Sequence, residues 1–299
     1  MAQFILSAFA DEAAADLKGQ IAALKRNGID CIEIRNIDGK CVIDYSEEEI
    51  SAFKAELDAA GIRVSSLGSP IGKYEITDDF EPHFERFKKA VKTAQLLGTK
   101  NMRMFSFFIP DGKTATDYSQ EVYSRLTQML AYAKAEGIQL CHENEARIYG
   151  RRPEEALELQ EQLPDLKAIF DPANYIMENA DITWSIDRIA PYLEYLHIKD
   201  ACLEDYLACK AGYRASYLCD AVNQVLEKAA AARGSKDTYL TVEPHLFAFT
   251  GYSNLDHREM KHKFSYANQN ESFDAAVNAL KTILNQLGYK KGEDNKWKK

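Results

Sequence analysis

The sequence predicts an α/β fold, a single (β/α)8 TIM barrel, and three observations support that class. Eight short β-prone segments alternate with longer segments whose apolar residues recur at three- and four-residue spacing. Glycine repeatedly separates the end of a helical segment from the next strand, where a left-handed residue ends a helix. The first strand-to-helix turn, Ala10-Asp11-Glu12, lacks the glycines of a doubly wound, phosphate-binding sheet. Eight strand–helix units in 299 residues therefore favour a closed barrel.

The eight strands are expected at residues 4–9, 31–35, 63–67, 101–105, 139–143, 167–171, 195–199 and 239–243. The intervening segments are expected to be helices because their apolar side chains fall on one helical face. Gly28, Gly61, Gly98 and Gly137 each precede the next strand, and Gly288 follows the last helical segment. Pro153 suits the first turn of a helix, where no backbone N–H is needed.

Composition places the chain among ordinary globular proteins. Of its residues, 46% are hydrophobic and 28% are charged, and no run approaches the roughly 18 apolar residues of a membrane span. The net charge of −9 disfavours binding to phosphate backbones, so neither nucleic acid nor a membrane is an expected partner. We expect one domain over residues 1–289, followed by a basic, frayed tail over residues 290–299.

The cysteines and the N-terminus bear on the cellular compartment. None of the six cysteines stands in a Cys-x-x-Cys arrangement, which favours reduced thiols and a cytoplasmic protein. The apolar N-terminal segment has no basic region ahead of it and is shorter than the core of a signal peptide. We therefore interpret it as the first strand.

Polar side chains gather where the last four predicted strands end, which is the end that carries the active site in such barrels. Strand five ends at Glu143, strand six at Asp171 and strand eight at Glu243, and strand seven contains His197. Because side chains alternate between the two faces of a strand, all four share the inward phase. Three converging carboxylates would repel one another unless a cation lay among them. The sequence therefore predicts one divalent metal ion bound by these four side chains.

The ligand chemistry restricts the ion and the reaction. Three carboxylates and one imidazole suit Mn²⁺, Mg²⁺ or Co²⁺, and Zn²⁺ is also compatible. Such an ion would polarise a substrate carbonyl or hydroxyl and stabilise a developing enediolate. A carboxylate beside it could remove the proton α to the carbonyl. His142 has the outward phase and is interpreted as structural.

The motifs at these strand ends carry a family resemblance. They are His142-Glu143-Asn144, Phe170-Asp171-Pro172-Ala173-Asn174, His197-Ile198-Lys199-Asp200 and Val242-Glu243-Pro244. Over nearly its whole length the chain resembles the xylose isomerase-like superfamily of sugar and sugar-phosphate isomerases and epimerases. The resemblance implies that Glu143 and Glu243 are catalytic and flank opposite faces of a sugar, one removing a proton and the other returning it. It implies a divalent-metal-dependent isomerase or epimerase whose substrate is a small sugar or polyol.

Five further side chains are candidate substrate contacts: Lys199, Asn174, His245, Glu33 and Arg103. Lys199 lies two residues beyond His197, in the inward phase, where it would hold a hydroxyl or phosphate or form a salt bridge to Asp200 or Glu33. Glu33 and Arg103, on strands two and four, would orient a ligand, bind an anionic group or pair with each other. Asn174 stands where, by the resemblance, ketose 3-epimerases have a histidine that contacts the substrate.

The segment 246–271, between the last strand and the last helix, is rich in Phe, Tyr, His and Asn. A stretch of that length without a clear helical or strand period is usually functional when ordered. It is predicted to be a lid over the site or, alternatively, a contact with a second subunit of a homo-oligomer.

The same ligand set leaves other functions open. An inosose- or polyol-type dehydratase would use the same metal site, and a non-catalytic sugar-binding barrel would retain it. An apurinic-site endonuclease is disfavoured because Ser65-Ser66-Leu67-Gly68 and Phe105-Ser106-Phe107 offer no further metal ligands at strands three and four. The identity of the sugar, its phosphorylation, the metal and the oligomeric state stay open at this point.

Overall fold

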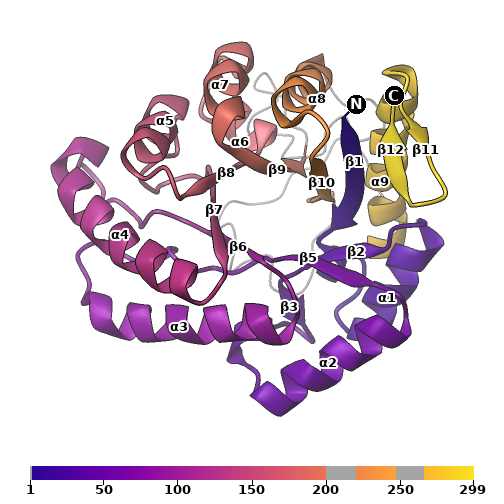
Figure 1. Ribbon diagram of the computed structural model, residues 1–299, viewed down its shortest axis with the longest axis horizontal. Coiled ribbons are helices and arrows are strands. Elements are labelled where there is room, and N and C mark those ends of the chain that lie inside the picture. Colours follow the sequence, from indigo (N-terminus) through magenta and orange to yellow (C-terminus); the bar gives the residue numbers. More distant parts are fainter. Residues whose placement is uncertain (1, 200–219, 247–265) are drawn as a thin grey trace.

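The structure is a computed structural model that describes residues 2–199, 220–246 and 266–299 (Figure 1). Its strands are β1 (Gln3–Ala8), β2 (Cys31–Ile34), β3 (Asn36–Ile37), β4 (Lys40–Cys41), β5 (Arg63–Leu67), β6 (Asn101–Met104), β7 (Gln139–Glu143), β8 (Lys167–Phe170), β9 (Leu193–Ile198), β10 (Asp237–Val242), β11 (Lys290–Lys291) and β12 (Lys296–Lys298). Its α-helices are α1 (Leu17–Arg26), α2 (Glu47–Ala59), α3 (Phe80–Leu96), α4 (Ser119–Ala135), α5 (Pro153–Gln162), α6 (Pro172–Met177), α7 (Ile182–Ile189), α8 (Asp220–Arg233) and α9 (Gln269–Gln286). Short 3-10 helices are η1 (Ala10–Glu12), η2 (Val42–Asp44), η3 (Ala115–Tyr118) and η4 (Ala190–Tyr192).

Eight of the strands form the barrel that the sequence predicts. Hydrogen-bonded neighbours follow the order β1-β10-β9-β8-β7-β6-β5-β2, and each of these ladders is parallel. The strands at the two ends of that order, β1 and β2, lie against each other, so the sheet closes. The helices surround the strands (Figure 1). The prediction of a (β/α)8 barrel is therefore confirmed, with strand boundaries displaced by a residue or two.

Local sequence signals set the helix boundaries. The Ser46 hydroxyl accepts a hydrogen bond from the Glu49 N–H, and the Glu49 carboxylate accepts one from the Ser46 N–H, which is the capping box that begins α2. Pro153 is the first residue of α5, as expected. Gly61 follows α2 with φ of +71°, a conformation that glycine adopts without strain.

The C-terminal tail differs from the prediction of a frayed end. β11 and β12 form a hairpin, and β12 pairs antiparallel with β1, placing Trp297 opposite Phe4. Trp297 is only 5% exposed and belongs to the main hydrophobic core. Lys291 Nζ donates to the Gly28 carbonyl, so the hairpin spans from β1 to the turn before β2. In the sequence, the many lysines of the tail suggested a solvated end. The buried Trp297 side chain and the pairing of β12 with β1 instead hold the tail against the barrel.

The barrel interior has an apolar layer beneath a polar one. Cys141, Ile169 and Tyr195 form a small apolar cluster separate from the main core, and Tyr239 packs against it. The first three each precede a predicted metal ligand by two residues on the same side of the strand, so the ligands lie directly beyond this layer.

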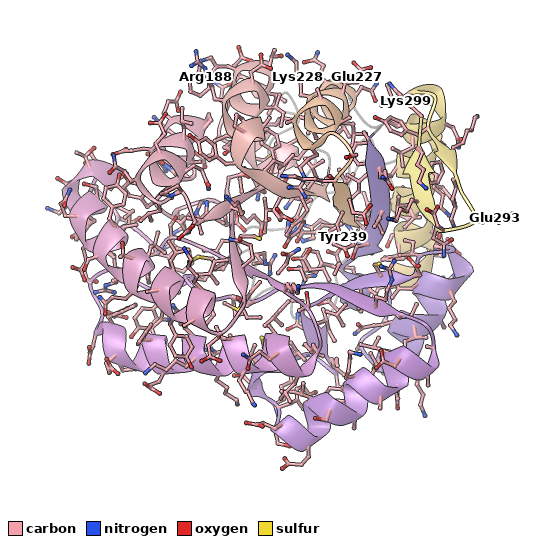
Figure 2. The ribbon with its side chains drawn as sticks, in the orientation of Figure 1. Arg188, Glu227, Lys228, Tyr239, Glu293 and Lys299 are labelled. Atoms are coloured by element: carbon pink, nitrogen blue, oxygen red, sulfur yellow. The ribbon has the colours of Figure 1, made fainter. Side chains whose placement is uncertain are left out.

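Charged side chains cover the outer helices (Figure 2). Lys228 on α8, for example, lies with its Nζ 2.6 Å from a carboxylate oxygen of Asp187 on α7. Among the helices that the structure describes, none combines the length and apolar character needed to cross a membrane.

Candidate metal centre

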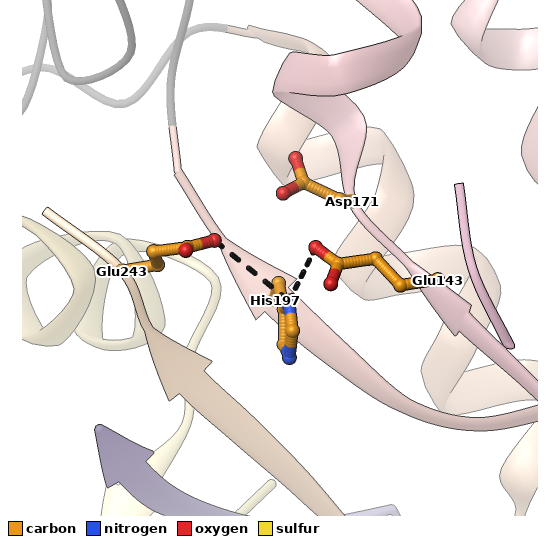
Figure 3. A group of neighbouring side chains, drawn as sticks. All are labelled: Glu143, Asp171, His197 and Glu243. Atoms are coloured by element: carbon orange, nitrogen blue, oxygen red, sulfur yellow. Dashed lines mark hydrogen bonds and ion pairs between the residues drawn. The ribbon is translucent and has the colours of Figure 1, made fainter. Parts of the chain in front are cut away.

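Glu143, Asp171, His197 and Glu243 come together at the carboxyl ends of β7, β8, β9 and β10. One ligand atom from each lies within 4.8 Å of the others, and all four residues are buried. Figure 3 shows Glu143 and Glu243 pointing toward His197 from either side. The His197 Nδ1 lies 2.8 Å from Glu143 Oε1 and 3.8 Å from Glu243 Oε2. This donor set, three carboxylates and one imidazole, suits a divalent cation that prefers oxygen ligands.

Asp171 is oriented by the helix that it begins. It is the N-cap of α6, and its Oδ1 accepts a hydrogen bond from the Asn174 N–H at 3.1 Å. Pro172 follows as the first helical residue, where its fixed φ favours helix initiation. The other oxygen, Oδ2, is buried and lies 3.0 Å from Lys199 Nζ, an ion pair that is not an aligned hydrogen bond. A buried carboxylate oxygen that faces a cation in this way has the charge and position that a divalent ion requires of a ligand, so this atom fits the predicted ion.

Asn144 and Asn174 connect the ends of β7 and β8. The Asn144 side chain accepts from the Asp171 N–H and donates to the Asp171 carbonyl, both at 3.0 Å. Asn174, a candidate substrate contact, donates its side-chain amide to the Asn144 carbonyl at 2.8 Å. These hydrogen bonds join the backbone that follows β7 to the backbone that follows β8, just beyond the last ladder hydrogen bonds between the two strands.

Lys199 bridges two of the candidate ligands. Its Nζ lies 3.0 Å from Asp171 Oδ2 and 3.1 Å from Glu243 Oε2, and the side chain is buried. Burial would lower the pKa of Lys199, but the two carboxylates outweigh it and raise that pKa well above its usual value. Its pairing partners are thus Asp171 and Glu243, whereas Asp200, one partner expected from the sequence, lies outside the described residues.

The pKa values follow from burial and from these partners. Burial would raise the pKa of Glu143, but His197 and Arg103 lower it to about 2. Burial would lower the pKa of His197, but Glu143 and Glu33 raise it to about 10. Burial raises the pKa of Asp171 to about 6, with Lys199 opposing the shift. Glu143 is therefore a carboxylate, with Arg103 and His197 facing its two oxygens.

Arg103 and Glu33 act within the protein. Arg103 pairs with Glu143 at 3.0 Å and donates to the carbonyls of Gly68 and Ser69, in place of the expected pairing with Glu33. Glu33 lies on the other side of the His197 ring from Glu143, 3.2 Å from Nε2. The structure thus gives both side chains protein partners, and their contact with a substrate stays a prediction.

His245 and Arg35 surround the far oxygen of Glu243. His245, just past β10 with φ of +47°, places Nε2 3.2 Å from Glu243 Oε1 and 3.5 Å from Glu12 Oε1. These three residues form a second group of potential metal ligands. Arg35, however, bonds Glu243 at 3.1 Å and Glu12 at 3.3 Å, so a guanidinium already provides the positive charge there. This second group is an ion-pair network built on Arg35.

Sequence reasoning did not single out Arg35, Asp11 and Glu12. Asp11 accepts two hydrogen bonds from Arg35, at 2.9 and 3.0 Å. Arg35 shares the inward phase of Glu33, two residues earlier, and this parity was the available signal. Most of the predicted lid, residues 247–265, and the segment 205–216 after β9 lie outside the described residues.

Comparison with known structures supports the architecture. No curated protein sequence shows significant similarity to the chain. A probable 3-DHS dehydratase, AsbF, from Bacillus anthracis superposes with a TM-score of 0.68 at 14% identity, covering 93% of this chain and 98% of its own. D-psicose 3-epimerase with D-tagatose, from Clostridium cellulolyticum H10, gives 0.68 at 15% identity and covers 95% and 98%. The IolI protein with a bound zinc atom gives 0.66 at 15% identity and covers 96% and 99%.

At such identities these likenesses show the fold alone. The family is shown by a sequence model for xylose isomerase-like TIM barrels, which matches residues 21–206, well over half of the chain. That stretch includes the ends of β7, β8 and β9, and therefore three of the four clustered side chains. The protein belongs to the xylose isomerase-like TIM barrel family.

Proposed function

We propose that the protein is a divalent-metal-dependent sugar isomerase or epimerase that acts by proton abstraction α to a carbonyl. The observation that carries this proposal is the placement of two buried carboxylates on either side of one histidine nitrogen. Glu143 approaches His197 Nδ1 from β7, and Glu243 approaches it from β10 (Figure 3). Carboxylates that face a common space from different strands can remove a proton on one face of a substrate and return it on the other.

The four clustered side chains would hold the ion, with Mn²⁺, Mg²⁺ or Co²⁺ favoured by the three carboxylates. The bound ion would supply the positive charge that stabilises an enediolate. The chain's own residues set the geometry: Arg103 fixes Glu143, while Lys199 and Arg35 fix Glu243. Return of the proton to the same carbon by the second carboxylate gives an epimer, and its return to the neighbouring carbon gives an isomer. The proposed substrate is a small sugar or polyol. The proposal also includes assembly of the protein into a homo-oligomer.

A dehydratase on the same site is the second candidate, and Lys199 is the observation that favours it. Its ammonium lies 3.1 Å from the Glu243 carboxylate, so a cationic hydrogen-bond donor stands beside a base within the barrel. Loss of water from a polyol needs a base for the α-proton and a group that stabilises the departing hydroxyl, whereas epimerisation needs no departing group. A probable dehydratase among the similar folds supports keeping this alternative.

The test is incorporation of solvent deuterium. The metal-loaded protein is incubated in D₂O with free and phosphorylated ketoses, and the substrate is followed by NMR. We expect deuterium at the carbon next to the carbonyl, and a decrease in exchange on the order of 100-fold for Glu143→Gln and for Glu243→Gln. Glu158→Gln is the matched control, because Glu158 on α5 accepts hydrogen bonds from Tyr123 on α4 and from Tyr149 in the turn before α5, outside the cluster.

The outcomes separate the candidate functions. Unchanged exchange in both glutamine variants would contradict the assigned roles. An unsaturated product formed with loss of water would favour the dehydratase. Saturable sugar binding without exchange or product would favour a non-catalytic binding barrel.

A further inference from the structure

We propose that Glu33 is a positioning residue that holds His197 in one tautomer, with the proton on Nε2 and the lone pair of Nδ1 directed at the metal site. This inference rests on the proposed metal-dependent function. It assigns a task to a carboxylate that lies on β2, across the barrel from the ligand strands, and outside the four-residue cluster.

The two nitrogens of the His197 ring face different carboxylates. Nδ1 lies 2.8 Å from Glu143 Oε1, within the cluster, whereas Nε2 lies 3.2 Å from Glu33 Oε2. A neutral imidazole has one N–H and one lone pair, so the group that accepts the N–H decides which nitrogen can bind a metal. Glu143 accepts from Nδ1 only while no ion is bound, because a nitrogen that binds a metal must give up its proton. Glu33 lies outside the cluster and accepts from Nε2, so it keeps the proton on that nitrogen and leaves Nδ1 for the ion.

Glu33 is itself held firmly. It is 1% exposed, and its Oε1 accepts a hydrogen bond from the Tyr195 hydroxyl at 2.8 Å. Its Oε2 accepts from the Thr241 hydroxyl at 2.8 Å, alongside His197 Nε2. The Tyr195 hydroxyl lies 2.9 Å from that of Ser66. Side chains from β2, β5, β9 and β10 thus form a hydrogen-bonded group on the Nε2 side of the His197 ring. This group fixes the rotation of the ring as well as its tautomer.

This placement argues against a direct contact between Glu33 and substrate. The His197 ring separates Glu33 from the carboxylates of the cluster, and Tyr195 and Thr241 occupy its other sides. Glu33 can therefore act on the reaction only through His197. Partners that orient a metal-binding histidine typically change metal affinity by 10- to 100-fold when they are removed.

The first measurement is the affinity for Mn²⁺, by calorimetry, of the wild type, Glu33→Gln and Glu33→Ala. We expect a 10- to 100-fold loss of affinity in Glu33→Ala and a smaller loss in Glu33→Gln, whose amide oxygen can still accept from Nε2. Ser7→Ala is the matched control, because Ser7 forms a buried hydroxyl pair with Ser65 inside the same barrel and is hydrogen-bonded to neither His197 nor Glu33. Thr241→Val, which removes one donor to Glu33, serves if Glu33→Ala fails to fold.

The second measurement reports the tautomer directly. In the Zn²⁺-loaded wild type, ¹⁵N NMR of His197 should show a metal-bound Nδ1 and a protonated Nε2, and the same spectrum of Glu33→Ala shows whether that state depends on Glu33. A metal-bound Nε2, or equal Mn²⁺ affinity in all variants, would overturn the role of Glu33 and leave the proposed function standing. A wild type that binds no divalent ion would overturn both.

Discussion

The two halves of the barrel mouth are built from different chemistry. The ligand half, formed by the ends of β7 to β10, carries Glu143, Asp171, His197 and Glu243. The guanidinium half, formed by β1, β2, β5, β6 and the turns after them, carries an alternating series of cations and aromatic rings: Arg35, Phe9, Arg103, Phe105 and Lys73. The Phe9 ring centre lies 4.2 Å from the Arg35 guanidinium carbon and 4.9 Å from that of Arg103. The Phe105 ring centre lies 5.1 Å from Arg103 and 4.5 Å from the Lys73 ammonium.

The difference shows how a barrel can bury several carboxylates before any ion binds. Arg103 and Arg35 reach across to Glu143 and Glu243, so the guanidinium half neutralises part of the ligand half. The aromatic rings between the cations keep them apart and attract them through the negative faces of the rings. Within the ligand half, Lys199 pairs with Asp171 and Glu243, so a cation faces each of the three clustered carboxylates. The following predictions test whether the guanidinium half stabilises the carboxylates of the ligand half in this way.

The largest effect is expected for Arg103→Met. It removes the guanidinium partner of Glu143 in a site where both side chains are buried, and leaves this carboxylate paired with His197 but not with an arginine. We expect a loss of about 3–5 kcal/mol in the free energy of unfolding, measured by urea denaturation. Arg63→Met is the matched control, because the Arg63–Asp30 pair has a similar distance of 3.2 Å but an Arg63 side chain that is 55% exposed. The control should lose about 1 kcal/mol or less. Equal losses in the two variants would contradict the interdependence of the halves.

A smaller effect is expected from a divalent ion. At a concentration ten times the dissociation constant, Mn²⁺ should add about 1.4 kcal/mol to the free energy of unfolding, seen as a higher melting temperature. Asp171→Asn should abolish this gain because it removes one of the three carboxylates of the candidate metal cluster. Glu12→Gln should retain it, because Glu12 belongs to the Arg35 network. Stabilisation that survives Asp171→Asn would place the ion elsewhere.

The fold and the ligand cluster could be read from the sequence for one physical reason. Strand periodicity fixes which side chains point inward, and the carboxyl ends of parallel strands meet at one end of a barrel. Four residues far apart in the chain, Glu143, Asp171, His197 and Glu243, thus had to converge. The hydrophobic spacing of the helices and the glycines that end them fixed the strand count.

Partner choice among inward charges could not be read in this way. Parity placed Arg103 and Glu33 inside the barrel, but it does not say whether Arg103 reaches Glu33 or Glu143. Side-chain length and the tilt of neighbouring strands decide that, and Arg103 reaches Glu143 on the adjacent β7. The C-terminal hairpin escaped prediction because its strands are two and three residues long, too short for a periodic signal.

The last prediction concerns acid and the guanidinium half. His83, on α3, is buried, and its Nε2 accepts a hydrogen bond from the Gly72 N–H at 3.0 Å. Gly72 packs against the Phe105 backbone and precedes Lys73, so this bond holds the turn that ends the cation–aromatic series. Burial lowers the pKa of His83 to about 4, and the nearby Arg86 and Arg125 add to the shift. Protonated His83 could no longer accept the bond.

Because the folded pKa of His83 lies below the unfolded value, its contribution to stability is complete above about pH 6.5 and is lost as the pH falls toward about 4. His83→Gln keeps an acceptor without a titrating proton, so the stability of this variant should fall less steeply with acid. The expected difference in slope is at most about 1.4 kcal/mol per pH unit, measured by urea unfolding between about pH 6.5 and about pH 4.5 without added metal. Comparing the slopes of the two proteins cancels the titration of the ligand half, which both share. Parallel slopes would mean that acid acts on the ligand half alone and that the turn at Gly72 is held by its packing against Phe105.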